Sequence, residues 1–248
     1  MELSPTLPTG AAPAVLVKIC GLTRADEAAS CIAAGADWIG LNFHPGSPRF
    51  LDPDRSGEIV SAIGSPERAV GLFVNRPAAE VARVAARLGI STVQLHGDEP
   101  PEDLVALTHL RIVRAFRLGR PEDVEAMAGY LDRARSLGRV PDAVLVDALV
   151  AGVAGGTGTV VAGPVLDRLA SMATSDSLPP MILAGGLNPE NVRGRVDRVR
   201  PWMVDVASGV ESGPGRKDPR LVAAFIRAAR GEPRERPGQP VDKGSGAD

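Results

Sequence analysis

The stretch VLVKICGLTRADEAASCIAAGADWIGLNF, residues 15–43, decides the fold of this chain. It begins with a short apolar run that ends in a cysteine, and it closes with a second short apolar run. An alanine-rich amphipathic stretch lies between the two. Short apolar runs favour buried strands, whereas the longer periodic stretch favours a helix. The order of strand, helix and strand is typical of an α/β fold with parallel strands.

The same alternation continues as far as residue 230. Further strands are predicted at residues 69–74, 92–96, 111–117, 143–147, 181–185 and 202–208. Further helices are predicted at residues 53–64, 77–89, 101–108, 121–138, 160–170, 188–196 and 218–230. Eight strand–helix units predict a single (β/α)8 TIM barrel. A doubly wound open sheet is the alternative, but it would normally have fewer units and a G-x-G-x-x-G after the first strand.

Two tails flank the predicted barrel, which we place at residues 14–230. Residues 1–13 contain three prolines and no periodic pattern, so we expect a flexible N-terminal tail. Residues 231–248 are polar and rich in glycine and proline, which indicates a disordered C-terminal tail.

Composition narrows the class of protein. A hydrophobic fraction of 44% is ordinary for a globular protein, and a net charge of −2 provides no attraction to nucleic acid or anionic lipid. No signal peptide or membrane-length apolar run is present, so we expect a cytoplasmic protein with reduced thiols. The two cysteines and three histidines are scattered without zinc spacing, and we expect no metal.

Candidate site residues stand where the predicted strands end, because barrel enzymes keep their active site there. Cys20 ends the first strand, and Lys18 lies on the same face one layer deeper. A buried lysine needs a partner, and strand eight adjoins strand one in a closed barrel. We therefore predict a structural pair between Lys18 and Asp205.

Three other strand ends carry polar side chains. Arg49 follows the second strand and is either a solvated loop residue or a two-pronged carboxylate clamp. His96 ends the fourth strand and is a candidate for the lining of the mouth. Asp147 ends the sixth strand as either a cap or a catalyst. The loop after it contains GGTG with Gly156, which suits closure over a ligand or anion binding by backbone amides.

Glycines follow the last two strands. Gly185 and Gly186 come after strand seven, and Ser208 and Gly209 come after strand eight. Glycines here, followed by a helix N-terminus, form the recurrent phosphate site of this fold. The sequence therefore predicts a phosphorylated small-molecule substrate.

Taken together, seven sequence words resemble the phosphoribosylanthranilate isomerase family of tryptophan biosynthesis over about residues 17–230. The words occur in order as KICGLTRADEA, GADWIGLNFHPGSPRF, GLFVN, VQLHGDE, VLVDA followed by GGTG, ILAGGLNPENV and DVASGVESGPGRKD. One departure follows GGTG, where family members often have an aromatic and an acidic residue and this chain has TVVA at 159–162.

The resemblance implies an Amadori rearrangement of N-(5-phosphoribosyl)anthranilate to 1-(2-carboxyphenylamino)-1-deoxyribulose 5-phosphate. It implies that Cys20 is the general base, that Asp147 is the general acid and that Arg49 binds the anthranilate carboxylate. It assigns the phosphate pocket to the residues after strands seven and eight. The scheme requires no cofactor. We expect nearby positive potential and a helix N-terminus to lower the pKa of the Cys20 thiol.

Two alternative functions remain open. The isomerase of histidine biosynthesis performs the same chemistry with an aspartate pair, and Cys20 in place of an aspartate argues against it. A non-catalytic barrel that binds a phosphorylated ligand would keep the glycines but could lose Cys20 or Asp147. A single barrel is compatible with a monomer or a homodimer.

Overall fold

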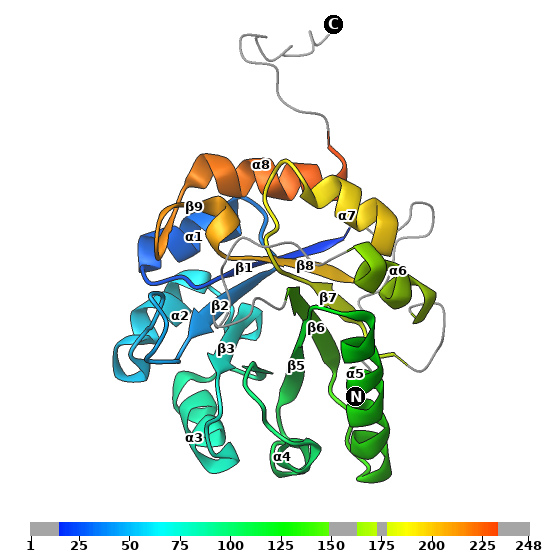
Figure 1. Ribbon diagram of the computed structural model, residues 1–248. Helices are drawn as coiled ribbons and strands as arrows, with labels where there is room; N and C mark the ends of the chain where they lie inside the picture. Colours follow the sequence, from blue (N-terminus) through cyan, green and yellow to red (C-terminus); the bar gives the residue numbers. More distant parts are fainter. Residues whose placement is uncertain (1–14, 149–162, 173–177, 233–248) are drawn as a thin grey trace, which may run out of the picture.

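Eight parallel strands close into a barrel in the computed structural model, which describes residues 15–148, 163–172 and 178–232 (Figure 1). In barrel order the strands are β1 (Leu16–Cys20), β2 (Trp38–Asn42), β3 (Ala69–Phe73), β4 (Thr92–Leu95), β5 (Arg111–Leu118), β6 (Ala143–Ala148), β7 (Met181–Leu183) and β8 (Met203–Val206). The pairing of β8 with β1 completes the circle. The predicted TIM barrel is therefore confirmed.

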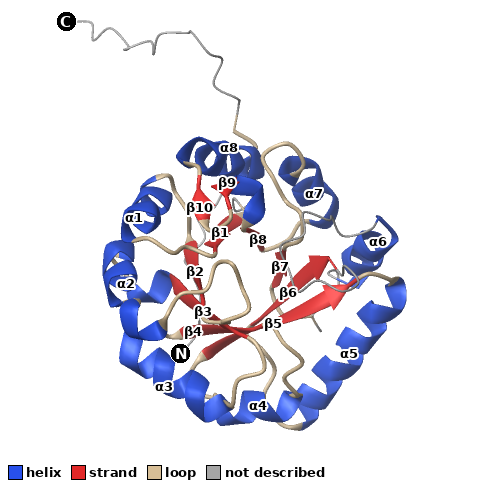
Figure 2. Ribbon diagram, turned by 60° about the vertical axis from the view of Figure 1, so that its left-hand side comes forward, coloured by secondary structure: helices blue, strands red, loops and turns tan. Residues whose placement is uncertain are grey.

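Helices form a ring around the strands, as Figure 2 shows. They are α1 (Ala25–Ala33), α2 (Gly57–Ile63), α3 (Ala78–Leu88), α4 (Pro101–Ala106), α5 (Pro121–Ser136), α6 (Gly163–Met172), α7 (Val192–Val199) and α8 (Pro219–Arg230). None of the helices within the described ranges has the length and apolar character needed to cross a bilayer. The predicted N-terminal tail (residues 1–13), residues 233–248 of the predicted C-terminal tail and the GGTG loop with Gly156 lie outside the described residues.

Helix α8 illustrates why these sequences form these elements. Asp218 precedes the helix, and its carboxylate accepts hydrogen bonds from the backbone N–H groups of Arg220 and Leu221. Gly231 ends the helix in the left-handed region, at φ 77°. The buried side chains recur at helical spacing, and they are Val222, Phe225, Ile226 and Ala229. This apolar stripe packs the helix onto the barrel.

Alternation along each strand decides which side chains enter the barrel. The interior apolar cluster consists of Val113, Ala115, Ala143, Leu145, Ile182, Ala184 and Met203. By the same two-residue period, Cys20, Asp147 and Asp205 also point inward. Each lies at or near the C-terminal end of its strand, so all three face the mouth of the barrel.

The segment between β8 and α8 contains short elements that the sequence did not predict. A three-residue 3-10 turn, Ser208–Val210, comes first, followed by a small hairpin of β9 (Glu211–Gly213) and β10 (Arg216–Lys217). Gly215, at φ 74°, allows the tight turn of this hairpin. After β7, α7 likewise begins only at Val192. The helices predicted at residues 188–196 and 218–230 are present as α7 and α8, but neither of them follows its strand directly.

Candidate active site

The floor of the site is an ion pair between Lys18 and Asp205. The two residues are in register on β1 and β8, and Lys18 Nζ lies 2.9 Å from Asp205 Oδ1. Lys18 is fully buried, and Asp205 is 8% exposed. The predicted pair is thus confirmed, and it supplies the partner that a buried ammonium group requires.

Cys20 lies one layer above this pair, as predicted. It is in register with Gly40 of β2, and a methyl group placed on Gly40 would lie 2.6 Å from the Cys20 sulfur. The sulfur therefore occupies space that only a glycine leaves open on the neighbouring strand. Cys20 is 6% exposed and is a free thiol.

The electrostatic environment of Cys20 differs from the expectation. Burial raises the pKa of this thiol, and the nearby ammonium groups of Lys18 and Lys217 oppose that shift without overcoming it. The expected lowering of the pKa of Cys20 was therefore wrong, because desolvation of the thiolate outweighs the positive charges. The thiol is the dominant form at neutral pH in the structure.

A chain of polar side chains reaches Asp147 from β4. Asp147 Oδ2 lies 3.5 Å from His96 Nε2, and His96 Nδ1 lies 2.6 Å from Gln94 Nε2. With the Gln94 amide assigned as donor to Nδ1, the neutral ring carries its proton on Nε2, facing Asp147. The sequence marked His96 as a lining candidate but gave no signal for its contact with Asp147.

A small hollow lies beside Asp147. Its volume is about 60 Å³, and it is lined by Asp147, Ala184, Gly185, Gly186, Leu187, Asp205, Val206, Ala207, Ser208 and Gly209. The four residues predicted for phosphate binding after strands seven and eight therefore share one wall with the proposed acid. Cys20 is not among the lining residues. Asp205, which pairs with Lys18 one layer below Cys20, does line this hollow.

The glycines in this wall have conformational reasons to be glycine. Gly185 and Gly186 both adopt positive φ, 84° and 60°, which other residues rarely do. A methyl group placed on Gly209 would collide with the carbonyl oxygen of Leu187. Close contact between the loops after β7 and β8 therefore depends on Gly209.

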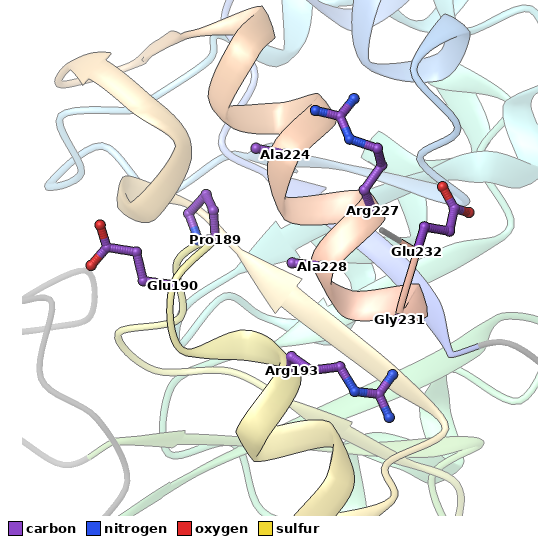
Figure 3. A pocket seen from close by; sticks show the side chains of 8 residues that line it. All are labelled: Pro189, Glu190, Arg193, Ala224, Arg227, Ala228, Gly231 and Glu232. Carbon is purple, nitrogen blue, oxygen red and sulfur yellow. The ribbon is translucent and has the colours of Figure 1, made fainter. Parts of the chain in front are cut away.

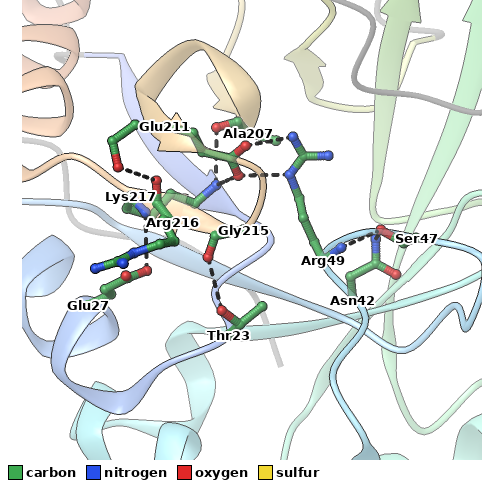
Figure 4. Close-up of polar contacts among 11 residues, drawn as sticks. Thr23, Glu27, Asn42, Ser47, Arg49, Ala207, Glu211, Gly215, Arg216 and Lys217 are labelled. Carbon is green, nitrogen blue, oxygen red and sulfur yellow. Dashed lines mark hydrogen bonds and ion pairs between the residues drawn. The ribbon is translucent and has the colours of Figure 1, made fainter.

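Arg49 lies near the mouth, but its guanidinium is already paired. Arg49 Nε and Nη2 donate to the two carboxylate oxygens of Glu211, at 2.8 and 2.7 Å (Figure 4). Lys217 Nζ binds the same carboxylate at 2.7 Å. The Arg49 side chain crosses directly over Gly21, where a methyl group would collide with it. The sequence identified Arg49 but not its partner Glu211.

A separate cavity of about 530 Å³ lies between α7 and α8, in the outer layer of the barrel (Figure 3). Figure 3 shows Glu190, Arg193, Arg227 and Glu232 at its edges, with small residues between them. None of the candidate catalytic residues lines it. Across the described ranges, no group of three or more His, Cys, Asp or Glu side chains is arranged to hold a metal ion.

The chain is similar to known proteins over most of its length. A family model described as N-(5'phosphoribosyl)anthranilate (PRA) isomerase matches residues 17–228. The N-(5'-phosphoribosyl)anthranilate isomerase of Geobacter metallireducens is 41% identical over 216 residues, covering 87% of this chain and 99% of the relative.

Solved structures give a similar result. The phosphoribosyl anthranilate isomerase of Thermotoga maritima has a TM-score of 0.75 at 33% identity, covering 88% of this chain and 99% of that one. A second such isomerase structure holds reduced 1-(o-carboxyphenylamino)-1-deoxyribulose 5-phosphate. It has a TM-score of 0.71 at 32% identity, with coverage of 88% and 99%.

Proposed function

Because this chain belongs to the N-(5'-phosphoribosyl)anthranilate isomerase family, we propose that it converts N-(5'-phosphoribosyl)anthranilate to 1-(2-carboxyphenylamino)-1-deoxyribulose 5-phosphate in tryptophan biosynthesis. The family match over residues 17–228 carries this proposal, since it spans nearly all of the described barrel. The reduced product bound by a related isomerase supports the same substrate class.

The reaction needs one proton donor and one proton acceptor. Asp147 donates a proton to the ribose ring oxygen, the bond between that oxygen and the anomeric carbon breaks, and an iminium forms. The Cys20 thiolate then removes the proton from the neighbouring carbon, C2′, which the iminium has made acidic. The resulting enolamine tautomerises to the ketone. Both proton transfers are general acid–base steps that protein side chains can provide.

The surroundings of each group suit its role. The positive charge of the iminium and the ammonium of Lys18 favour the thiolate at the step where Cys20 acts as base. After Asp147 has released its proton, the Nε2–H of His96 faces the new carboxylate from 3.5 Å. An N–H group that points at a carboxylate stabilises its charged form by electrostatic attraction.

The two ends of the substrate bind at different parts of the mouth. Backbone groups of Gly185, Gly186, Ser208 and Gly209 hold the phosphate, and Gly156 of the sixth loop is a further candidate for substrate binding. Arg49 binds the anthranilate carboxylate through Nη1, the guanidinium nitrogen outside its pair with Glu211. The scheme uses no cofactor. We also propose a cytoplasmic location and a monomer or homodimer.

An assay with two substrates tests this function. Purified full-length protein should convert N-(5'-phosphoribosyl)anthranilate at least about 100-fold more efficiently than the aminoaldose of the histidine pathway. Turnover of the histidine-pathway substrate alone would assign the protein to the alternative isomerase. Binding of the reduced product without turnover of either substrate would instead favour a non-catalytic barrel.

A further inference from the structure

A buried cluster of three charges lies where the segment after β8 meets the loop after β2. Arg49, Glu211 and Lys217 form it, and their side chains are 12%, 4% and 1% exposed (Figure 4). Glu211 uses both carboxylate oxygens on Arg49 and shares one of them with Lys217. The edge of Arg49 best suited to a carboxylate is therefore occupied inside the protein.

This arrangement poses a charge problem for a carboxylate clamp. Arg49 and Glu211 alone would form a neutral pair, and Glu211 would repel an incoming carboxylate. Lys217 adds a second positive charge, so the three groups together carry +1. Interactions between charges are stronger in a buried site than in water, so this difference matters for an anionic ligand.

Three hydrogen bonds hold Lys217 in position. Its Nζ donates to the carbonyl oxygen of Ala207 at 3.1 Å as well as to Glu211. Its backbone N–H donates to the Glu27 carboxylate at 3.2 Å.

Burial lowers the pKa of Lys217, whereas the pair with Glu211 acts in the opposite direction and favours the ammonium form. Burial alone would raise the pKa of Glu211, but hydrogen bonds from Arg49 and Lys217 outweigh burial and lower that pKa.

We propose that Lys217 is a positioning residue that neutralises Glu211, so that Glu211 can orient Arg49 while Arg49 still attracts the aromatic carboxylate of the substrate. The inference rests on the proposed function and deepens it. Ala207, which binds Lys217, directly precedes the phosphate residues Ser208 and Gly209. The chain after β8 therefore organises both anionic ends of the substrate.

Two ligands and one substitution test the proposal. The ligands are reduced 1-(o-carboxyphenylamino)-1-deoxyribulose 5-phosphate and the matching phenylamino compound that lacks the carboxyl group. Lys217→Met should weaken binding of the carboxylated ligand about tenfold and leave the other ligand within about twofold. In turnover assays it should raise KM about tenfold and change kcat less than about threefold.

A charge-balanced double variant separates electrostatics from packing. Lys217→Met with Glu211→Gln removes one charge of each sign and leaves the site at +1, so it should recover most of the lost affinity. Lys217→Arg should also retain affinity for the carboxylated ligand. Arg216→Met is the matched control, because it removes an exposed charge from the same hairpin and should change neither affinity.

Three results would overturn the proposal. One is equal weakening of both ligands by Lys217→Met, which would indicate a purely structural role. Another is unchanged binding of the carboxylated ligand, and the third is failure of the double variant to recover affinity. If the wild-type protein binds neither ligand, the proposed function itself fails, and this inference fails with it.

Discussion

Cys20 is a thiol whose burial outweighs the attraction of two ammonium groups. Because burial raises the pKa of Cys20, little thiolate exists at neutral pH. As long as the pH stays below that pKa, each increase of one pH unit raises the thiolate fraction about tenfold. The rate of alkylation by iodoacetamide should therefore keep rising from about pH 7 to pH 9 without a plateau, since only the thiolate reacts.

The alkylation experiment needs a background without the second thiol. Burial raises the pKa of Cys31 to about 11, and Cys31→Ala removes that residue as a competing site. Adding Cys20→Ala should abolish the remaining reaction. A rate that levels off below about pH 8 would show that positive charge dominates after all and that the account of the Cys20 environment is wrong.

The pair of Lys18 and Asp205 makes a prediction about stability. Lys18→Met would leave the buried Asp205 carboxylate without its ion-pair partner, and the free energy of unfolding should fall by about 3 kcal/mol or more. Urea unfolding followed by circular dichroism measures this loss. Arg133→Met, which breaks an exposed pair with Glu102, is the control and should have little effect.

A double substitution checks the physical reason for this instability. Lys18→Met with Asp205→Asn removes both charges, so it should recover part of the stability lost in Lys18→Met. If Lys18→Met were nearly as stable as the wild-type protein, the pair would not be holding the barrel floor together.

At the scale of elements, the loops after β7 and β8 must approach each other closely to form the hollow. Gly209→Ala would push the β8 loop away from the Leu187 carbonyl, so the phosphate pocket should widen. We expect competitive inhibition by inorganic phosphate to weaken about tenfold or more, with KM rising in parallel. Steady-state kinetics at several phosphate concentrations give both quantities.

Gly213→Ala is the matched control for this experiment. Gly213 lies in β9 of the same segment, and a methyl group there would meet no atom within 4 Å. Equal effects of the two substitutions would mean that the loss arises from general disturbance of the segment. That result would contradict the assignment of the loops after β7 and β8 to phosphate binding.

The elements themselves could largely be predicted from the sequence. Short apolar runs located all eight strands of the barrel, because a strand buried on both sides is largely apolar. The hairpin β9–β10 could not be predicted, because its strands are short and polar and carry no such period. Its stability depends on contacts with distant segments, including the hydrogen bond from Thr23 to the carbonyl oxygen of Gly215.

At the scale of the whole molecule, barrel closure decides which residues meet. Closure alone allowed the pair of Lys18 and Asp205 to be predicted, because strands one and eight must be neighbours. Contacts made by loops and long side chains follow no such rule. Arg49 meets Glu211 across 162 positions of sequence, and neither residue carries a local signal for the other. The pair of Lys18 and Asp205 could thus be predicted from the sequence, but the contact of Arg49 with Glu211 could not.

The proposed isomerisation requires a thiol and a carboxyl on opposite parts of one barrel mouth to act on one sugar. The most direct test is the kcat of Cys20→Ala and of Asp147→Asn with N-(5'-phosphoribosyl)anthranilate, alongside their affinity for the reduced product. Each substitution should lower kcat by about 100-fold to 10,000-fold, while affinity for the reduced product changes less than about threefold. Near-wild-type turnover by either variant would contradict the catalytic role of that residue.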